Sequence, residues 1–303
     1  MSKKSKNNRR NKNLKLWIEG ARVRTLPLAF APVLAGAAGA WAANSFSWTL
    51  TLLCTAVALF LQVGVNYAND YSDGIRGTDA KRVGPLRLTG SGSAKPKFVK
   101  NTAFAFFALA ALAGLGVVVV TQLWWLIAVG VICIIAAWFY TGGKSPYGYA
   151  GLGELAVFIF FGLVAVIGTA FVQIGNLDFL SPMLAVASGS FASAVLLVNN
   201  IRDRELDQHV GKRTLAVKLG AKWSKVWFVI LLWVPAVVGV AASVLYPTLV
   251  VTLAVLLLLI PITLIFVMAK TPRELILVLK LTSFASLAYS LLVLWGVAGI
   301  GLI

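Results

Sequence analysis

The chain has 303 residues, of which 59% are hydrophobic and only 12% are charged, and its formal net charge is +17. Because an ordinary soluble domain has about 25% charged residues, this composition excludes a water-soluble globule and predicts an all-α, polytopic bundle of transmembrane helices. The basic residues lie in an N-terminal tail and between apolar runs. The positive charge is therefore attributed to the orientation of the chain in a lipid bilayer, and no nucleic-acid partner is expected.

Apolar runs bounded by charge, Gly or Pro predict about nine membrane spans in chain order. They lie near residues 26–43, 48–68, 101–120, 123–141, 153–174, 181–199, 225–244, 247–269 and 278–302. We expect residues 1–20 to form a basic, disordered cytoplasmic tail. Residues 21–303 are expected to form a single transmembrane domain whose oligomeric state the sequence leaves open.

The Lys and Arg residues predict the orientation of these spans. All 27 of them fall at alternate ends of the nine spans. The segments that hold them are 1–24, 76–100, Lys144, 202–225 and 270–280. Since cytoplasmic segments are enriched in Lys and Arg, the N-terminus and these connections are expected in the cytoplasm, and the C-terminus outside.

Acidic residues are concentrated in two short segments that follow the second and the sixth spans. Six of the ten acidic residues in the chain lie there, namely Asp70, Asp73 and Asp79 in the first segment and Asp203, Glu205 and Asp207 in the second. Both segments emerge on the predicted cytoplasmic side. The two clusters are therefore expected to lie at the same end of the bundle.

Oxygen-bearing side chains recur at every fourth position in both segments, which aligns them along one face of a helix. The sets are Asn66 with Asp70, Asn69 with Asp73, and Asn199 with Asp203 and Asp207. Neighbouring carboxylates repel unless a cation joins them, and Mg²⁺ prefers a few carboxylates combined with substrate phosphates. The expected Mg²⁺ ligands are Asn69, Asp70, Asp73, Asn199, Asp203 and Asp207, while the roles of Asn66 and Asp79 stay open.

Basic side chains accompany both acidic segments. They are Arg76, Lys81, Arg82 and Arg87 after the first, and Arg202, Arg204, Lys212 and Arg213 in the second. One interpretation is a solvated surface with local ion pairs. Two such clusters on one membrane face favour a metal-bridged diphosphate, whose remaining oxygens the bases would bind. We expect this role for Arg76, Arg202, Lys212 and Arg213.

These segments resemble the UbiA superfamily of intramembrane aromatic prenyltransferases, which are nine-helix bundles with two Asp-rich motifs on cytoplasmic connections. The residues that match the family's motifs are Asn69-Asp70-x-x-Asp73, Asn199-x-x-x-Asp203-x-x-x-Asp207 and Tyr140-Thr-Gly-Gly-Lys144. In the family the Lys of this third motif contacts the diphosphate. The resemblance thus implies a catalytic role for Tyr140 and Lys144.

Within the superfamily the chain is most similar to the branch that prenylates 1,4-dihydroxy-2-naphthoate in menaquinone synthesis. The supporting stretches are residues 21–36, 69–79, 84–92, 145–162 and 198–220. The resemblance implies Mg²⁺-dependent transfer of a polyprenyl group from a polyprenyl diphosphate to this aromatic acid, with loss of CO₂, giving demethylmenaquinone. It also implies a bacterial cytoplasmic membrane, with the active site facing the cytoplasm.

Two other functions stay open at this point. One is prenylation of a different aromatic acceptor, such as 4-hydroxybenzoate. The other is membrane transport, which also uses a polytopic bundle with charged residues. A transporter would be expected to carry ionisable groups near the middle of its spans, whereas here the acidic residues gather at one face.

The resemblance places Glu154 near the aromatic acceptor, as a catalytic and acceptor-binding residue that orients a ring hydroxyl. A competing interpretation is an interfacial carboxylate paired with Lys144. Arg22 is expected to bind either the acceptor carboxylate or a phosphate. The segment 84–97 is interpreted as a lid over the site or as a flexible linker.

Overall fold

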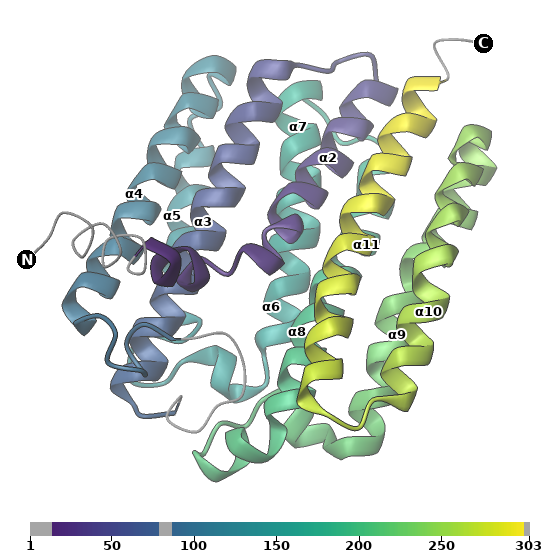
Figure 1. Cartoon of the computed structure of the whole chain (residues 1–303). Helices are drawn as coiled ribbons and strands as arrows, with labels where there is room; N and C mark the ends of the chain where they lie inside the picture. Colours follow the sequence, from purple (N-terminus) through teal and green to yellow (C-terminus); the bar gives the residue numbers. More distant parts are fainter. Residues whose placement is uncertain (1–13, 79–86, 300–303) are drawn as a thin grey trace, which may run out of the picture.

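The computed structural model describes residues 14–78 and 87–299, and every regular element in these ranges is a helix, as the sequence predicts. The elements are η1 (Val23–Thr25), α2 (Pro27–Ala42), α3 (Trp48–Ile75), α4 (Pro96–Thr121), α5 (Leu126–Phe139), η2 (Tyr147–Ala150), α6 (Gly153–Val157), η3 (Phe158–Ile167), α7 (Gly168–Ile174), α8 (Leu180–His209), α9 (Leu215–Leu245), η4 (Pro247–Val255), α10 (Leu256–Met268) and α11 (Pro272–Ala298). The helices run roughly side by side along one direction (Figure 1).

The predicted span count agrees with these helices. In the described residues, seven helices are long and apolar enough to cross a membrane. The pair Leu14–Thr25 and Pro27–Ala42, bent by 45°, makes an eighth candidate, and the shorter apolar helix α5 occupies the position of the predicted fourth span. Residues 14–20 of the predicted tail are helical, whereas residues 1–13 lie outside the described residues.

Helices α3 and α8 continue well past their apolar runs. The second predicted span stops near residue 68, whereas α3 extends to Ile75. The sixth stops near residue 199, whereas α8 extends to His209. Apart from Asp79, which lies outside the described residues, the acidic residues of both segments therefore lie on the last turns of helices rather than in loops. Polar residues can continue a helix beyond the apolar stretch that marks the bilayer.

The fifth span is one continuous helical rod with a π-helical middle. Segment η3 forms this part, between α6 and α7. π-Helical turns are rare and occur most often at functional sites. Gly162 allows η3 to approach α8 closely, because a Cβ atom there would lie 2.6 Å from the carbonyl oxygen of Ala185 and 2.8 Å from the Cα of Gly189.

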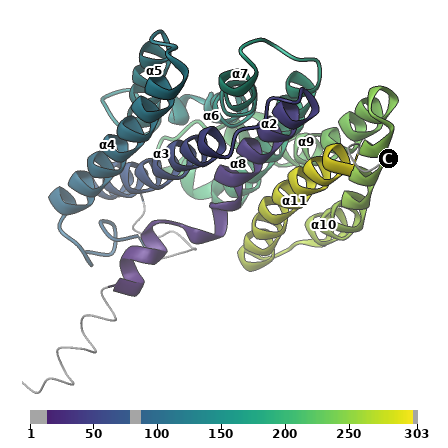
Figure 2. The same cartoon turned by 90° about the horizontal axis from the view of Figure 1, so that it is seen from above.

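Helix α8 lies at the centre of the bundle (Figure 2). Of its most apolar 18 residues, 78% are buried, compared with 22% for α3 and 33% for α9. Its buried residues include many Ala, Ser and Gly, which let neighbouring backbones approach. The main hydrophobic core forms around it, and a second core joins α3 to α4.

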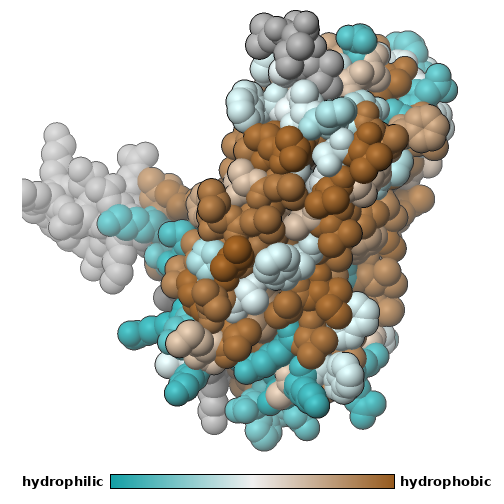
Figure 3. Space-filling view, turned by 90° about the vertical axis from the view of Figure 1, so that its right-hand side faces the viewer, coloured by the Kyte–Doolittle hydropathy of each residue, from teal (hydrophilic) through white to brown (hydrophobic). Residues whose placement is uncertain are grey.

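The outer surface suits a bilayer. A broad hydrophobic band covers the middle of the face shown in Figure 3, and hydrophilic residues gather at its lower end. Large apolar side chains such as Leu112, Val237 and Leu257 are exposed on this outer surface. Exposed Trp48 and Trp295 lie near helix ends, where aromatic side chains commonly mark the membrane interface.

Candidate active site

The two acidic segments touch each other at one end of the bundle. Lys212 lies just after the end of α8. Its Nζ atom is 3.1 Å from the Oδ1 atom of Asp73, which lies on the last turn of α3. Both side chains are buried. Residues 139 positions apart in the chain therefore form a single polar centre, as expected from the placement of both segments on one membrane face.

Tyr149 completes the surroundings of Asp73. Its hydroxyl donates a hydrogen bond to Asp73 Oδ1, and Lys212 Nζ lies 4.5 Å from the centre of its ring. Burial and the adjacent Asp73 carboxylate raise the pKa of Tyr149 above its usual value, so its hydroxyl remains a donor. Sequence reasoning missed Tyr149, whose only signal was its place in the segment 145–162.

Asp203 and Asn199 share one face of α8, as their spacing predicts. Arg202 binds both of them. Its Nε and Nη2 atoms donate to the two oxygens of Asp203 at 2.7 and 2.6 Å, and Nη2 also donates to Asn199 Oδ1 at 2.9 Å. Asp207, one turn further along this face, is also buried. A basic side chain, that of Arg202, thus lies beside the oxygen atoms of the second predicted ligand set.

The predicted Tyr140–Lys144 motif is held against the end of α3. The Thr141 hydroxyl donates to Asn69 Oδ1 at 2.7 Å. Arg76 donates to the backbone carbonyls of Thr141 and Gly143, so this predicted diphosphate ligand contacts the protein backbone. The Lys144 side chain is exposed at the edge of the same connection.

Asp70 and Asn66 form hydrogen bonds with backbone groups of other segments. The Asp70 carboxylate accepts hydrogen bonds from the backbone N–H groups of Leu88 and Thr89, both at 2.8 Å. The Asn66 amide donates to the carbonyl of Ala21 at 2.9 Å. The α3–α4 connection is therefore attached to α3 at Leu88 and Thr89, near the start of its second described part.

One predicted diphosphate ligand is less enclosed, and one residue whose role the sequence leaves open is not described. Arg213 is exposed, and its backbone N–H donates to the Tyr149 carbonyl at 2.9 Å. Asp79, whose role the sequence leaves open, lies outside the described residues, as do Lys81 and Arg82.

Glu154 lies in the first turn of α6 and is 5% exposed. Asn200 donates to its Oε1 atom at 2.9 Å, while Oε2 has no hydrogen-bond partner among the described residues. Because Lys144 is exposed and makes no contact with this carboxylate in that part of the chain, the alternative of a Glu154–Lys144 ion pair is not realised. Asn200, which the sequence did not single out, is adjacent to the predicted ligand Asn199.

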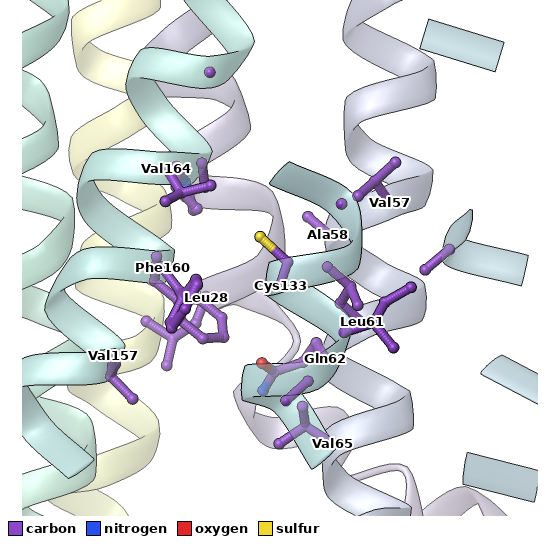
Figure 4. Close-up of a pocket in the computed structure, with 18 of the residues that line it drawn as sticks. Leu28, Val57, Ala58, Leu61, Gln62, Val65, Cys133, Val157, Phe160 and Val164 are labelled. Atoms are coloured by element: carbon purple, nitrogen blue, oxygen red, sulfur yellow. The ribbon is translucent and has the colours of Figure 1, made fainter. Parts of the chain in front are cut away.

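A cavity of about 550 Å³ extends from this polar end into the bundle. Its polar lining residues include Arg22, Gln62, Asn66, Asn69, Tyr140 and Asn199. Most of the other lining residues are apolar. Figure 4 shows Val157, Phe160 and Val164 on one side of the cavity and Val57 and Leu61 of α3 on the other.

The cavity is long enough for an extended apolar chain. On α3 its lining runs from Asn69 to Cys54. With a rise of 1.5 Å per residue, these positions are roughly 22 Å apart along the helix. Cys133 of α5 lines the same cavity, and the two cysteines are thus cavity-lining residues rather than parts of a metal site.

The donor set suits Mg²⁺ only together with a substrate. Within the described ranges, no three His, Cys, Asp or Glu side chains are grouped as a metal site by themselves. The oxygens on the ends of α3 and α8 are hard ligands of the type that Mg²⁺ prefers, and Mg²⁺ commonly completes its shell with substrate phosphates and water. These residues therefore fit Mg²⁺ when a substrate phosphate supplies the remaining oxygens.

Solved structures share this fold. A UbiA homolog from Aeropyrum pernix K1 superposes with a TM-score of 0.67, covering 93% of this chain and 100% of that one at 16% identity. A UbiA homolog from Archaeoglobus fulgidus, solved with GPP and Mg²⁺, gives a TM-score of 0.64 over 92% of this chain and 99% of that one at 14% identity. At these identities the likeness concerns the fold alone.

Curated relatives are considerably closer in sequence. The 1,4-dihydroxy-2-naphthoate octaprenyltransferase of Mycobacterium tuberculosis is 55% identical over 204 residues, which are 67% of this chain and 70% of that protein. The protein of the same name from Haemophilus influenzae is 41% identical over 242 residues, 77% of this chain and 79% of the relative. The model of the UbiA prenyltransferase family matches residues 29–287. The chain therefore belongs to the UbiA prenyltransferase family.

Proposed function

We propose that this protein transfers a polyprenyl group from a polyprenyl diphosphate to 1,4-dihydroxy-2-naphthoate, with release of diphosphate and of the ring carboxylate as CO₂. Membership in a prenyltransferase family makes the protein an enzyme, and the transporter alternative is therefore wrong. The choice of acceptor follows the curated relatives, which carry the name 1,4-dihydroxy-2-naphthoate octaprenyltransferase at 40 to 55% identity.

The observation that carries the proposal is the joining of a charged centre to an apolar cavity. Asp73 and Lys212 meet at the end of the bundle, and Asn69 and Asn199 line the adjoining end of the cavity. A polyprenyl diphosphate has the same two parts, a highly charged head and a long apolar tail. Its head would lie at the charged centre and its tail along the cavity, within reach of the surrounding lipid.

Residues of both acidic segments would hold the diphosphate. Asn69 and Asp73 on α3, with Asn199, Asp203 and Asp207 on α8, would hold Mg²⁺ together with phosphate oxygens. Bound Mg²⁺ supplies positive charge beside the departing diphosphate. Lys212 and Arg202, which already lie among these carboxylates, would bind the remaining phosphate oxygens.

The chain's own residues would assist cleavage of the C–O bond in two ways. Lys212 and Arg202 stabilise the negative charge that develops on the leaving diphosphate. The apolar walls of the cavity keep water away from the allylic cation until the electron-rich naphthoate ring attacks it. Lys144 and Arg213, at the exposed rim, would attract the anionic substrate.

The acceptor would bind near Glu154 and Arg22. Arg22 lines the polar end of the cavity, where its guanidinium can meet a carboxylate of the acceptor. Glu154 has one buried oxygen without a partner among the described residues, and this oxygen can accept a hydrogen bond from a ring hydroxyl. Asn200 holds the other oxygen and so orients the carboxylate.

A direct test uses the purified protein in detergent with Mg²⁺, a radiolabelled polyprenyl diphosphate and a panel of aromatic acids. Prenylated naphthoquinol and CO₂ should appear in equal amounts with 1,4-dihydroxy-2-naphthoate. Product from 4-hydroxybenzoate alone would reassign the acceptor, and no prenylated product from any acid would refute the activity.

The metal ligands can be tested in the same assay. Asp73→Ala and Asp207→Ala should each abolish turnover, because each removes an oxygen that helps to hold Mg²⁺ against the diphosphate. Thermal denaturation should show that both variants remain folded. Turnover near the wild-type value in both variants would contradict the proposed ligand set.

A further inference from the structure

Asp70 has the surroundings of a structural anchor. It is 1% exposed, and its two oxygens accept the backbone N–H groups of Leu88 and Thr89 at 2.8 Å each. Hydrogen bonds to an ionised carboxylate are about twice as strong as bonds between neutral groups. They connect the last turns of α3 to the connection that leads to α4.

Asp70 also lies on a different face of α3 from Asn69 and Asp73, the other expected ligands on this helix. Successive residues of an α-helix are turned by about 100°, so Asn69 and Asp73 form one stripe while Asp70 and Gly74 form the next. The stripe of Asn69 and Asp73 contacts the α5–α6 and α8–α9 connections. The stripe of Asp70 and Gly74 contacts the connection at residues 87–94.

Gly74 shows how closely this connection lies on α3. A Cβ atom at Gly74 would lie 2.4 Å from the Thr89 Cβ and 3.0 Å from the backbone nitrogen of Gly90. Leu88 is 1% exposed and packs in the second hydrophobic core, beside Gly20. Residues 88–90 are therefore held on α3 in three ways: by the hydrogen bonds to Asp70, by the buried Leu88 side chain and by the close approach at Gly74.

The attached connection carries Arg87 to the charged centre. The Arg87 Nη2 atom lies 3.9 Å from Asp73 Oδ2, and both side chains are largely buried. Arg87 immediately precedes Leu88, whose N–H group is bound by Asp70. Fixing the backbone at Leu88 therefore fixes the point from which the Arg87 side chain reaches Asp73.

We propose that Asp70 is a positioning residue that holds the 87–94 connection on α3, so that Arg87 faces Asp73 and the diphosphate, and that Asp70 is not a metal ligand. The part that concerns the diphosphate rests on the proposed function. The attachment itself does not, because it can be measured in protein without Mg²⁺ or substrate.

The test compares Asp70→Asn with Asp73→Asn and with a matched control, Asp178→Asn. Asp178 likewise accepts two backbone N–H groups, from Leu180 and Ser181, but it precedes α8 at the opposite end of that helix from Asp203. Hydrogen exchange is measured for peptides covering residues 87–94 without ligands. The Mg²⁺ concentration for half-maximal turnover is measured for each active variant.

Asp70→Asn should accelerate exchange in the 87–94 peptide and lower turnover by about 10- to 100-fold, with the Mg²⁺ requirement unchanged, since a small displacement of a substrate-contacting group can cost about 100-fold. Asp178→Asn should change neither reading. Unchanged exchange in Asp70→Asn, or a raised Mg²⁺ requirement in that variant, would overturn the proposal.

Two more substitutions, Arg87→Gln and Gly74→Ala, test the attachment separately from the metal site. Arg87→Gln should lower turnover, and adding Asp70→Asn to it should lower turnover little further, because both act through one side chain. Fully multiplicative losses would contradict the link through Arg87.

Gly74→Ala, which keeps every carboxylate, should reproduce the effects of Asp70→Asn and replaces that variant in the test if Asp70→Asn does not fold. If Asp73→Asn leaves the Mg²⁺ requirement unchanged, the proposed metal site fails while the exchange result still stands.

Discussion

At the scale of single residues, the expected ligand Asp73 interacts with three side chains, those of Lys212, Tyr149 and Arg87. Its partners come from three different connections between helices. Side chains from each connection therefore help to hold this buried carboxylate in place.

Lys212→Ala should reduce turnover by about 10²-fold, because it removes a cation that we propose stabilises the leaving diphosphate. It should also lower the melting temperature, since it removes the closer of the two buried cations that pair with Asp73. Lys222→Ala, which removes an exposed lysine from α9 near the same end, is the matched control. Equal kcat/KM in the two variants would show that Lys212 does not contact the substrate.

Tyr149→Phe should lower the free energy of unfolding by about 1.5–3 kcal/mol, the usual value for a hydrogen bond to a charged group. Burial and Asp73 raise the pKa of this phenol, so the donating hydroxyl is present at all lower pH values and is lost only as the pH rises through that raised pKa. The stability difference between wild type and variant should therefore be constant between about pH 7 and 9. A difference that decays within this interval would contradict the assignment.

Residue spacing predicted which polar residues gather, and it could not predict how each is used. The i,i+4 pattern placed Asn199 and Asp203 on one face of α8, as observed. The same pattern could not separate Asp70, which binds backbone N–H groups, from Asp73, which faces other charges. Tyr149 and Asn200 were missed because their importance comes from partners far away in the chain.

At the scale of elements, the π-helical segment η3 shows how a span can be shaped by its neighbour. Gly162 lies where η3 touches α8, whereas nothing lies within 4 Å of a Cβ atom built at Gly168, in the adjoining α7. The two glycines of the same span thus provide a natural comparison.

Gly162→Ala should destabilise the protein by about 1–3 kcal/mol, because the new methyl group meets the backbone of α8. Gly168→Ala should be neutral or stabilising by up to about 1 kcal/mol, since Ala favours a helix over Gly and here has space. Thermal denaturation of both purified variants checks this order. Equal melting temperatures would show that the contact between η3 and α8 can relax.

Hydropathy predicted the helices well and their irregularities poorly. Span positions followed from runs of apolar residues because a helix must be apolar where it crosses lipid. Segment η3 is apolar on all sides, so its sequence has no periodic signal that distinguishes π-helical from α-helical winding. The hydropathy-based span bounds also stopped short of the last turns of α3 and α8, since polar residues end an apolar run without ending a helix. Only the i,i+4 spacing of the polar residues pointed to helix there.

At the scale of the whole molecule, the connections that hold most of the described basic residues, α3–α4, α5–α6, α8–α9 and α10–α11, lie at one end of the bundle (Figure 1). This arrangement was predictable because every Lys and Arg falls at alternate span ends. Their position relative to the cytoplasm stays a prediction from the positive-inside rule.

Cysteine labelling tests that orientation in intact cells. In a variant without Cys54 and Cys133, a membrane-impermeant maleimide should label Asn176→Cys, at the end opposite the basic connections. Ser91→Cys, exposed in the α3–α4 connection, should be labelled only after the cells are permeabilised. The reverse result would invert the proposed topology.

The ion pair between Asp73 and Lys212 has a consequence for biosynthesis. Its partners are 139 residues apart, so the ribosome has translated α4 to α8 before the second partner exists. At about 5–20 residues per second, that interval lasts roughly 7–28 s. The two acidic segments of a nascent chain therefore cannot meet during this time, and the proposed diphosphate site can form only after Lys212 has been added.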